Sequence, residues 1–125
     1  MSGATHAPIL IVDDHDDTRD VVSSILELSG YATVGVDSAP AALRYLRGGG
    51  SPCLIVLDLH LPGMDGRAFL RELRAEPTLA GIPVVVFSGD SGTAIEGTAG
   101  FVRKGSDDPD VLLRVIAAAL ATERR

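Results

Sequence analysis

Short runs of apolar residues, rich in β-branched side chains, recur along the chain without alternating polar positions. They cover residues 9–12, 54–57, 84–87 and, more weakly, 101–102, and residues 31–36 form a fifth candidate that is less apolar. Runs of this kind are typical of strands that are buried on both faces. The pattern therefore predicts five strands in a sheet that is covered on both sides.

Helical periodicity fills most of the intervals between these strands. Ser38 and Asp108 are suited to cap two of the predicted helices, and Gly30 is suited to end another. Alternation of strands and helices indicates an α/β fold with a parallel sheet, organised as one (βα)5 domain over residues 1–125 with its core at about residues 8–122. The predicted helices cover residues 16–29, 39–47, 66–75 and a last segment that begins at Pro109.

The interval between the fourth and fifth strands does not fit this alternation well. Residues 88–100 contain four glycines, and Ile95 is their only large apolar residue. Because glycine costs about 1 kcal/mol relative to alanine at each helical position, a regular helix is unfavourable here. We expect a short or irregular fourth helix, amounting to a single turn or a loop.

Composition narrows the classes of function. The chain has 125 residues, 46% of them hydrophobic, which is enough to fill one core. Its 17 acidic and 11 basic residues give a formal net charge of −6, which argues against direct binding of nucleic acid and against docking on an anionic membrane.

The single cysteine, Cys53, excludes an internal disulfide, and we expect it to be a small core residue of a cytoplasmic protein. No apolar stretch approaches the ~20 residues of a transmembrane helix.

Polar side chains stand at the carboxyl ends of the predicted strands, where open parallel sheets bind their ligands. Asp13 and Asp14 follow the first strand, Asp58 follows the third, Ser88 ends the fourth and Lys104 ends the fifth. Three carboxylates and one ammonium give this edge a net charge of −2 (three negative, one positive). Because like charges held close together are costly, we expect a divalent cation here, and a site with few carboxylates and retained waters suits Mg²⁺.

The same arrangement suits phosphoryl transfer to a carboxylate. Asp58 follows a fully apolar strand and precedes a Pro62-Gly63 turn, so it would be held rigidly, as in-line attack on phosphorus requires. A metal ion and the ammonium of Lys104 would neutralise charge on the transferring group. Each residue also has an ordinary role by itself, since acidic pairs favour helix N-termini, a lone aspartate often caps a turn and a lone lysine is usually solvated. Their combination at successive strand ends favours a site.

These residues lie in motifs that resemble the receiver domain of two-component response regulators, from about Pro8 to Thr122. ILIVDDHDDTR resembles the family's first strand with its acidic pair, LIVLDLHLPGMDG its phosphoacceptor strand and loop, VVVFSGD its fourth strand, and GFVRK its fifth strand. The resemblance implies a flavodoxin-like fold with strand order 2-1-3-4-5 and helices on both faces. It also implies that Asp58 is phosphorylated by a histidine kinase or a histidine phosphotransfer protein, with Mg²⁺ or, in its place, Mn²⁺.

The resemblance assigns roles to the other residues of this edge. Lys104 would pair with phosphoryl oxygens, Ser88 would move to hydrogen-bond one of them, and Phe101 would turn inward into the vacated space. The domain would then control an output partner or a fused output domain that the sequence does not identify. The implied ligands of Mg²⁺ are Asp13, Asp14, Asp58 and the backbone carbonyl of His60.

The sequence departs from the family pattern at three places. Gly105 follows Lys104 where the family usually has proline, so we expect a trans peptide bond and a more mobile loop. The interval from Ser88 to Lys104 is shorter than usual by about one to two helical turns, which weakens the surface that reports phosphorylation. His60 and Asp90 lie two residues beyond the acceptor and the hydroxyl, where they would either modulate the phosphoryl lifetime or point to solvent.

Two other classes of protein are alternatives to the receiver domain. A phosphatase of the haloacid dehalogenase type also uses a strand-end aspartate, but its general acid two positions on is an acidic residue, and this chain has His60 there. A pseudo-receiver would keep the fold as a binding module without phosphorylation. The complete set of site residues argues against it, whereas Gly105 and the thin fourth helix argue weakly for it. We expect no catalysis beyond the domain's own phosphorylation and dephosphorylation.

Overall fold

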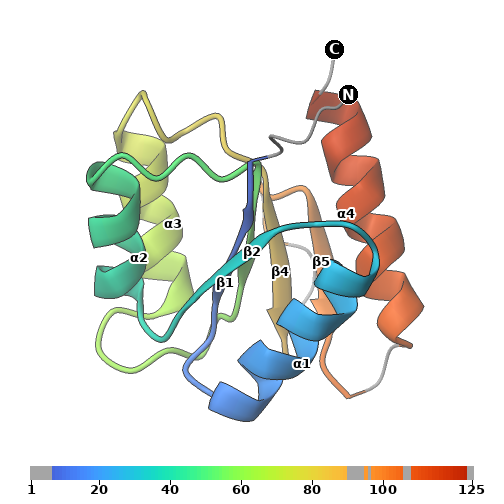
Figure 1. The fold of residues 1–125 in the computed structure, drawn as a ribbon. Coiled ribbons are helices and arrows are strands. Elements are labelled where there is room, and N and C mark those ends of the chain that lie inside the picture. Colours follow the sequence, from blue (N-terminus) through green and yellow to red (C-terminus); the bar gives the residue numbers. More distant parts are fainter. Residues whose placement is uncertain (1–6, 90–94, 96, 106–107, 124–125) are drawn as a thin grey trace.

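The computed structural model describes residues 7–89, 95, 97–105 and 108–123, and it contains a five-stranded sheet between two layers of helices (Figure 1). The strands are β1 (Ile9–Val12), β2 (Thr33–Val36), β3 (Leu54–Leu57), β4 (Val84–Ser88) and β5 (Gly100–Arg103). The helices are α1 (Asp16–Leu28), α2 (Ala39–Arg47), α3 (Gly66–Ala75) and α4 (Pro109–Glu123). These elements confirm the predicted ones, with small shifts at their ends. In the described part of the chain, no helix is long and apolar enough to span a bilayer.

The sheet has the order β2-β1-β3-β4-β5, and all of its strand pairs are parallel, as predicted. β3 is the central strand, with β1 on one side and β4 on the other. Three adjacent strands therefore end at Asp58, at the Asp13–Asp14 pair and at Ser88. The amide of Asp58 donates to the carbonyl of Val12 over 3.0 Å, so the hydrogen bonding between β1 and β3 continues to Asp58.

Each buried strand contributes alternate side chains to two separate cores, which explains why it is apolar at every position. Leu10 and Val12 of β1 pack in one core with α2 and α3, whereas Ile9 and Ile11 pack in the other with α1 and α4. Figure 1 shows the same division, with α2 and α3 on one side of the sheet and α1 and α4 on the other. The strands that carry the site are thus held from both faces.

Side-chain caps fix where the helices begin. Ser38 caps α2 by accepting a hydrogen bond from the amide of Ala41 over 3.2 Å. Asp108 accepts a hydrogen bond from the amide of Asp110 over 3.0 Å at the start of α4. Both residues act as the sequence predicted. Asp65, which the sequence analysis did not single out, caps α3 in the same way.

The link between β4 and β5 contains no helix within its described residues. The amide of Thr98 donates to the carbonyl of Ile95 over 3.1 Å and closes a turn. The amide of Ala99 then donates to the carbonyl of Val84 over 2.7 Å, which returns the chain to the sheet. The prediction of a single turn or irregular loop also concerns residues 90–94 and 96, which lie outside the described residues.

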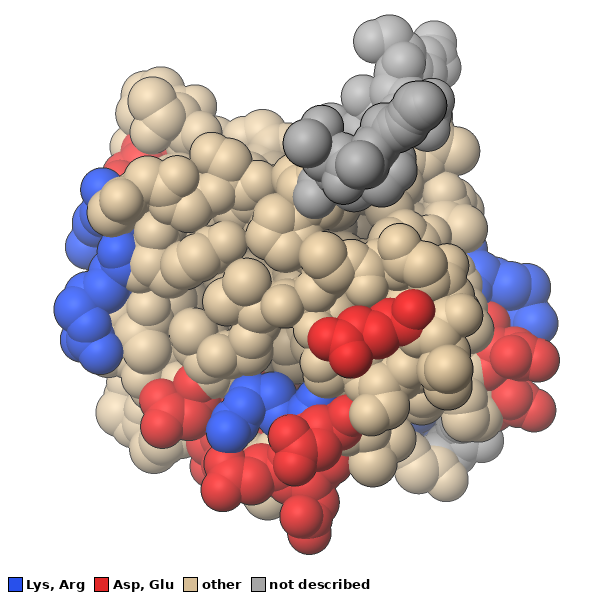
Figure 2. Space-filling model, viewed as in Figure 1, with Lys and Arg blue, Asp and Glu red and all other residues tan. Residues whose placement is uncertain are grey.

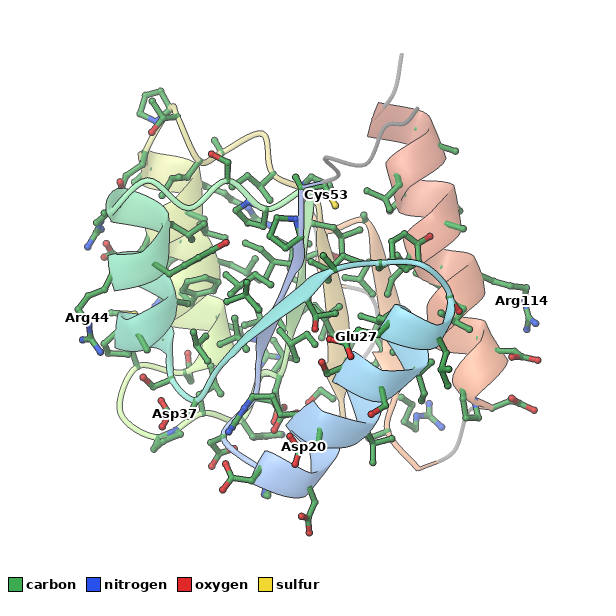
Figure 3. All side chains as sticks on the ribbon, in the orientation of Figure 1. Asp20, Glu27, Asp37, Arg44, Cys53 and Arg114 are labelled. Carbon is green, nitrogen blue, oxygen red and sulfur yellow. The ribbon has the colours of Figure 1, made fainter. Side chains whose placement is uncertain are left out.

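Cys53 precedes β3, at the end of the sheet opposite to Asp20 and Asp37 (Figure 3). It is partly buried and packs against the core beside α1 and α4. Burial raises the pKa of its thiol, although a backbone hydrogen bond offsets part of this effect. The thiol is therefore protonated at neutral pH, as expected for a small core residue.

Gly66, at the start of α3, packs directly against the backbone that follows β3. Its amide donates to the carbonyl of Leu59 over 2.9 Å. A Cβ atom at Gly66 would lie 2.6 Å from Cα of Leu59 and 2.7 Å from the carbonyl oxygen of Asp58, closer than Cβ atoms approach backbone in proteins. A side chain at this position would therefore displace the strand end that carries Asp58.

We predict that Gly66→Ala lowers the free energy of unfolding by about 1–3 kcal/mol, because the added methyl group overpacks against backbone. Gly81→Ala is the matched control, since a Cβ atom there meets nothing within 4 Å and the residue does not have a positive φ. The control should leave stability unchanged or slightly raised. Urea unfolding followed by circular dichroism measures both variants. Wild-type stability in Gly66→Ala would contradict this account of the contact.

Candidate functional site

The predicted strand-end residues converge on one edge of the sheet. Asp13, Asp58 and Ser88 are buried there, with 3%, 2% and 0% of their surface exposed. One oxygen each from Asp13, Asp14 and Asp58 and one ring nitrogen of His15 all lie within 4.8 Å of one another. Figure 2 shows acidic side chains gathered at this edge, at the bottom of the view, where α1 begins in Figure 1. The edge is therefore acidic both at its surface and in its interior.

The Asp58 carboxylate is held at both of its oxygens. Oδ1 accepts hydrogen bonds from the hydroxyl of Ser88 over 3.2 Å and from the amide of His60 over 3.1 Å. Oδ2 lies 3.0 Å from the ammonium of Lys104. These partners come from β4, from the loop after β3 and from the residue after β5, so three segments fix the orientation of Asp58.

Lys104 links two buried carboxylates. Its Nζ atom lies 2.7 Å from Oδ2 of Asp13 and 3.0 Å from Oδ2 of Asp58. The same atom lies 5.8 Å from the centre of the Phe87 ring, within reach of a cation–π contact. Burial by itself would lower the pKa of Lys104, but the hydrogen bonds to Asp13 and Asp58 and their charges outweigh it and raise the pKa above its ordinary value. Lys104 is therefore protonated throughout the neutral range.

The short loop between β1 and α1 presents the acidic pair. The amide of His15 donates to Oδ1 of Asp13 over 2.9 Å, and the guanidinium of Arg19 donates to the carbonyl of Asp13 over 2.8 Å. Arg19 lies across Gly35 of β2, where a Cβ atom would come within 3.2 Å of the arginine side chain. Arg19 thus ties the loop to the neighbouring strand, and Asp14 stays exposed beside the buried Asp13.

The acidic cluster suits a divalent cation. Carboxylate oxygens are hard ligands, and those of Asp13, Asp14 and Asp58 are close enough to share one ion. The three carboxylates and Lys104 leave a net charge of −2 (three negative, one positive), which Mg²⁺ or Mn²⁺ would balance. The part played by the backbone carbonyl of His60 stays a prediction.

Sequence reasoning did not identify His15 as part of the site. Its ring Nδ1 lies 3.3 Å from Oδ1 of Asp13 and 3.2 Å from Oδ1 of Asp14. The residue is the N-cap of α1, but its side chain makes no capping hydrogen bond. The only signal in the sequence was its position directly after the acidic pair.

The remaining predicted residues make fewer of the contacts around Asp58. Phe101 is half-buried in β5, and neither of the two core clusters includes it. Gly105 has a φ of 78°, a left-handed conformation that proline cannot adopt. The peptide bond between Lys104 and Gly105 is trans, as predicted, since the described residues contain no cis peptide bond. The side chain of His60 is exposed. Asp90 lies outside the described residues, so its effect on the site stays a prediction.

Comparison with known proteins assigns the family. Residues 9–116 match the family described as response regulator receiver domain. The transcriptional regulatory protein FixJ of Azorhizobium caulinodans is 33% identical over 118 residues, which cover 89% of this chain and 54% of FixJ. The two-component response regulator ORR5 of Oryza sativa subsp. japonica is 34% identical over 115 residues, which cover 87% of this chain and 84% of ORR5. The signal receiver domain of a signal transduction histidine kinase from Syntrophus aciditrophicus has a TM-score of 0.86 and 31% identity, covering 95% of this chain and 93% of that one.

The chain therefore belongs to the family of response regulator receiver domains, as its motifs predicted. It spans about half the length of FixJ and most of the length of ORR5. Domains of this family serve two-component signalling and are in general not metabolic enzymes. The family match covers the residues that converge at this edge of the sheet, and it leaves their individual roles as predictions.

We predict that Lys104→Met lowers the free energy of unfolding at neutral pH by up to about 3 kcal/mol, because it leaves Asp13 and Asp58 buried without their cation. Added Mg²⁺ should recover part of the loss, since a ligand that binds only the folded state stabilises it. Because the pKa of Lys104 is raised on folding, its contribution is complete below the ordinary pKa of lysine and is lost only as the pH rises through the raised value.

Arg103→Met is the matched control for this prediction. Arg103 is the exposed neighbour of Lys104 at the end of β5, so removal of its charge should have a small effect. Urea unfolding with and without Mg²⁺, at neutral and at alkaline pH, measures both variants. Equal losses of stability in the two variants would show that Lys104 does not offset buried charge.

Proposed function

We propose that this chain is a phosphoacceptor receiver domain in which Asp58 accepts the phosphoryl group. One observation carries the proposal: the Asp58 carboxylate is buried, oriented by Ser88 and His60 and paired with Lys104, beside a second buried carboxylate. The fixed orientation of this carboxylate supports the role, because in-line attack on phosphorus needs a positioned nucleophile. Family membership supports the same role.

The transfer combines this chain's groups with those of a phosphodonor protein. An oxygen of Asp58 attacks the phosphorus of a phosphohistidine, the P–N bond breaks, the imidazole leaves and takes up a proton, and an acyl phosphate forms on Asp58. When held by Asp13, Asp14 and Asp58, Mg²⁺ or Mn²⁺ supplies positive charge to the phosphoryl oxygens. Lys104, whose Nζ atom lies 3.0 Å from Oδ2 of Asp58, would supply a second positive charge. Water later hydrolyses the acyl phosphate, so the domain's own phosphorylation and dephosphorylation are the only reactions that it catalyses.

Ser88 and Phe101 provide the conformational response in this proposal. The hydroxyl of Ser88 is fully buried and contacts Oδ1 of Asp58, so a phosphoryl group on Asp58 would draw it into a new hydrogen bond. Phe101 pairs with Val86 in the adjacent strand and is half-buried, so its ring can turn into space that Ser88 vacates. A nearly complete switch requires phosphorylation to favour one packing by on the order of 5 kcal/mol.

A groove beside the site suits the phosphodonor protein. It has a volume of about 390 Å³, lies between α1 and the start of α4, and reaches Lys104. Val21, which lines it, is a large apolar residue with 57% of its surface exposed. We propose that a histidine kinase or histidine phosphotransfer protein covers this groove, because the groove extends to Lys104, the lysine that pairs with Asp58.

The pseudo-receiver alternative has less support. A pseudo-receiver would keep the fold without phosphorylation, whereas this chain keeps the complete set of residues. Asp58 contacts Ser88 and Lys104, Lys104 also contacts Asp13, and Asp14 lies in the same acidic cluster. The glycine that replaces the family's proline takes up a left-handed backbone that a glycine tolerates. We also place the protein in the cytoplasm, in keeping with its single cysteine.

Incubation with acetyl phosphate and Mg²⁺ should add one phosphoryl group to the wild type and none to Asp58→Asn, as read by intact mass. Asp37→Asn is the matched control, because Asp37 is an exposed aspartate that directly follows β2 at the same end of the sheet (Figure 3). It should be phosphorylated like the wild type, and EDTA should prevent the adduct. A folded wild type that gains no adduct would favour the pseudo-receiver.

Val21→Glu should slow phosphotransfer from a phosphorylated histidine phosphotransfer protein by about tenfold or more, because it buries a charge at the centre of an apolar contact. Labelling by acetyl phosphate should stay unchanged, since a small donor does not cover the groove. Leu28→Glu is the control, because Leu28 is 89% exposed at the other end of α1. Transfer to Val21→Glu at the wild-type rate would refute the docking surface and leave the role of Asp58 intact.

A further inference from the structure

His15 lies among the carboxylates of the site instead of capping the helix that it precedes. At N-cap positions, short polar side chains usually satisfy the first amides of the helix. The His15 side chain makes no such bond, and its Nδ1 atom lies 3.3 Å from Oδ1 of Asp13 and 3.2 Å from Oδ1 of Asp14. The side chain is 64% exposed, so burial does not force the ring into this place. Attraction to the acidic edge accounts for its position.

The spacing of these atoms is close to that of ligands on one metal ion. In an octahedral site with bonds of about 2.1 Å, neighbouring ligand atoms lie about 3.0 Å apart and opposite ones about 4.2 Å apart. The contacts of His15 with Asp13 and Asp14 are near the first of these distances. The four ligand atoms, with Asp58 included, all lie within 4.8 Å of one another, so small shifts of the side chains would bring all four into range of one ion.

We propose that His15 is a ligand of the metal site in this receiver domain. The inference rests on the proposed function, whose metal site it extends by one residue. An imidazole nitrogen suits nickel, zinc and iron, whereas carboxylate, carbonyl and water oxygens suit Mg²⁺. A site with three carboxylates and one imidazole therefore discriminates less in favour of Mg²⁺ than a site built from oxygen alone. The kind of divalent metal that occupies the site would then depend on His15.

A simple ion pair would also draw the ring toward Asp13 and Asp14, but it predicts that the ring does not contact a bound metal ion. A protonated imidazole has no free lone pair and cannot coordinate a metal ion. A cation that enters the cluster would expel a histidinium, since both carry positive charge. The two explanations are therefore separated by whether a nitrogen contacts the bound metal.

Spectroscopy of bound Mn²⁺ tests this contact directly. The full chain, produced without a histidine tag, is loaded with Mn²⁺, and electron spin-echo envelope modulation reports any coordinated nitrogen. We expect a nitrogen coupling in the wild type and its loss in His15→Ala. Asp20→Asn, at an exposed position further along α1 (Figure 3), should keep the coupling.

Titration calorimetry with Ni²⁺ and Mg²⁺ gives a second readout. His15→Ala should weaken binding of Ni²⁺ by about tenfold or more, the scale on which residues around a metal act, and should weaken binding of Mg²⁺ much less. His15→Asp replaces the nitrogen with a carboxylate oxygen. It should restore binding of Mg²⁺ without restoring the affinity for Ni²⁺.

Two results would overturn the assignment of His15: bound Mn²⁺ without nitrogen coupling in the wild type, and a coupling that survives His15→Ala. If Mn²⁺ binds without the coupling and Asp58→Asn weakens that binding, the proposed function stands and only this inference fails. If the wild type binds no metal and acetyl phosphate leaves no adduct, the proposed function fails as well.

Discussion

The shared ammonium of Lys104 makes it possible to bury two aspartates at one edge of the sheet. Asp13 and Asp58 are almost completely removed from solvent, and each lies within 3.0 Å of the same Nζ atom. Buried charges are costly unless they are paired, and like charges held together add to that cost. Because β4 lies between β5 and β3, the lysine side chain must extend over the end of β4, where Ser88 is small. The order of the strands and the chemistry of the site therefore depend on each other.

The central strand holds Asp58 on a buried, fully paired part of the sheet. All four residues of β3 are buried, and the strands on both sides of it are hydrogen-bonded to it. The loop that follows is closed by Gly66, which allows α3 to approach the backbone of Asp58 and Leu59. In the proposed function, a carboxylate on such a frame would keep the fixed orientation that phosphoryl transfer requires.

Much of the fold and of the candidate site could be predicted from the sequence because the relevant signals are local. The apolar runs at β1, β3 and β4 mark strands with neighbours on both faces, and parallel strands bring their carboxyl ends to one edge. That rule alone places Asp13, Asp58, Ser88 and Lys104 together, and the structure does bring them together. The family motifs then supplied the strand order.

The unpredicted features depend on contacts through space. Gly66 matters because a backbone seven residues earlier in the chain, at Leu59, passes within reach of its missing Cβ atom, and no local pattern reveals this approach. Arg19 holds the loop of the acidic pair through a carbonyl and through Gly35, which lies on a different strand. The place of His15 depends on which way its ring turns, and residue order does not determine a rotamer. The sequence could name the acidic pair but not the groups that position it.

That one lysine serves two carboxylates also has a thermodynamic consequence. A change of charge on Asp58 alters how strongly Asp13 holds the ammonium of Lys104. A change of charge on Asp13 likewise alters how strongly Asp58 holds it. In the proposed function, cation binding at the acidic cluster and phosphorylation of Asp58 would therefore be linked equilibria, and the factor by which each favours the other would be the same in both directions. A receiver domain that works in this way would respond to its ionic surroundings as well as to its phosphodonor.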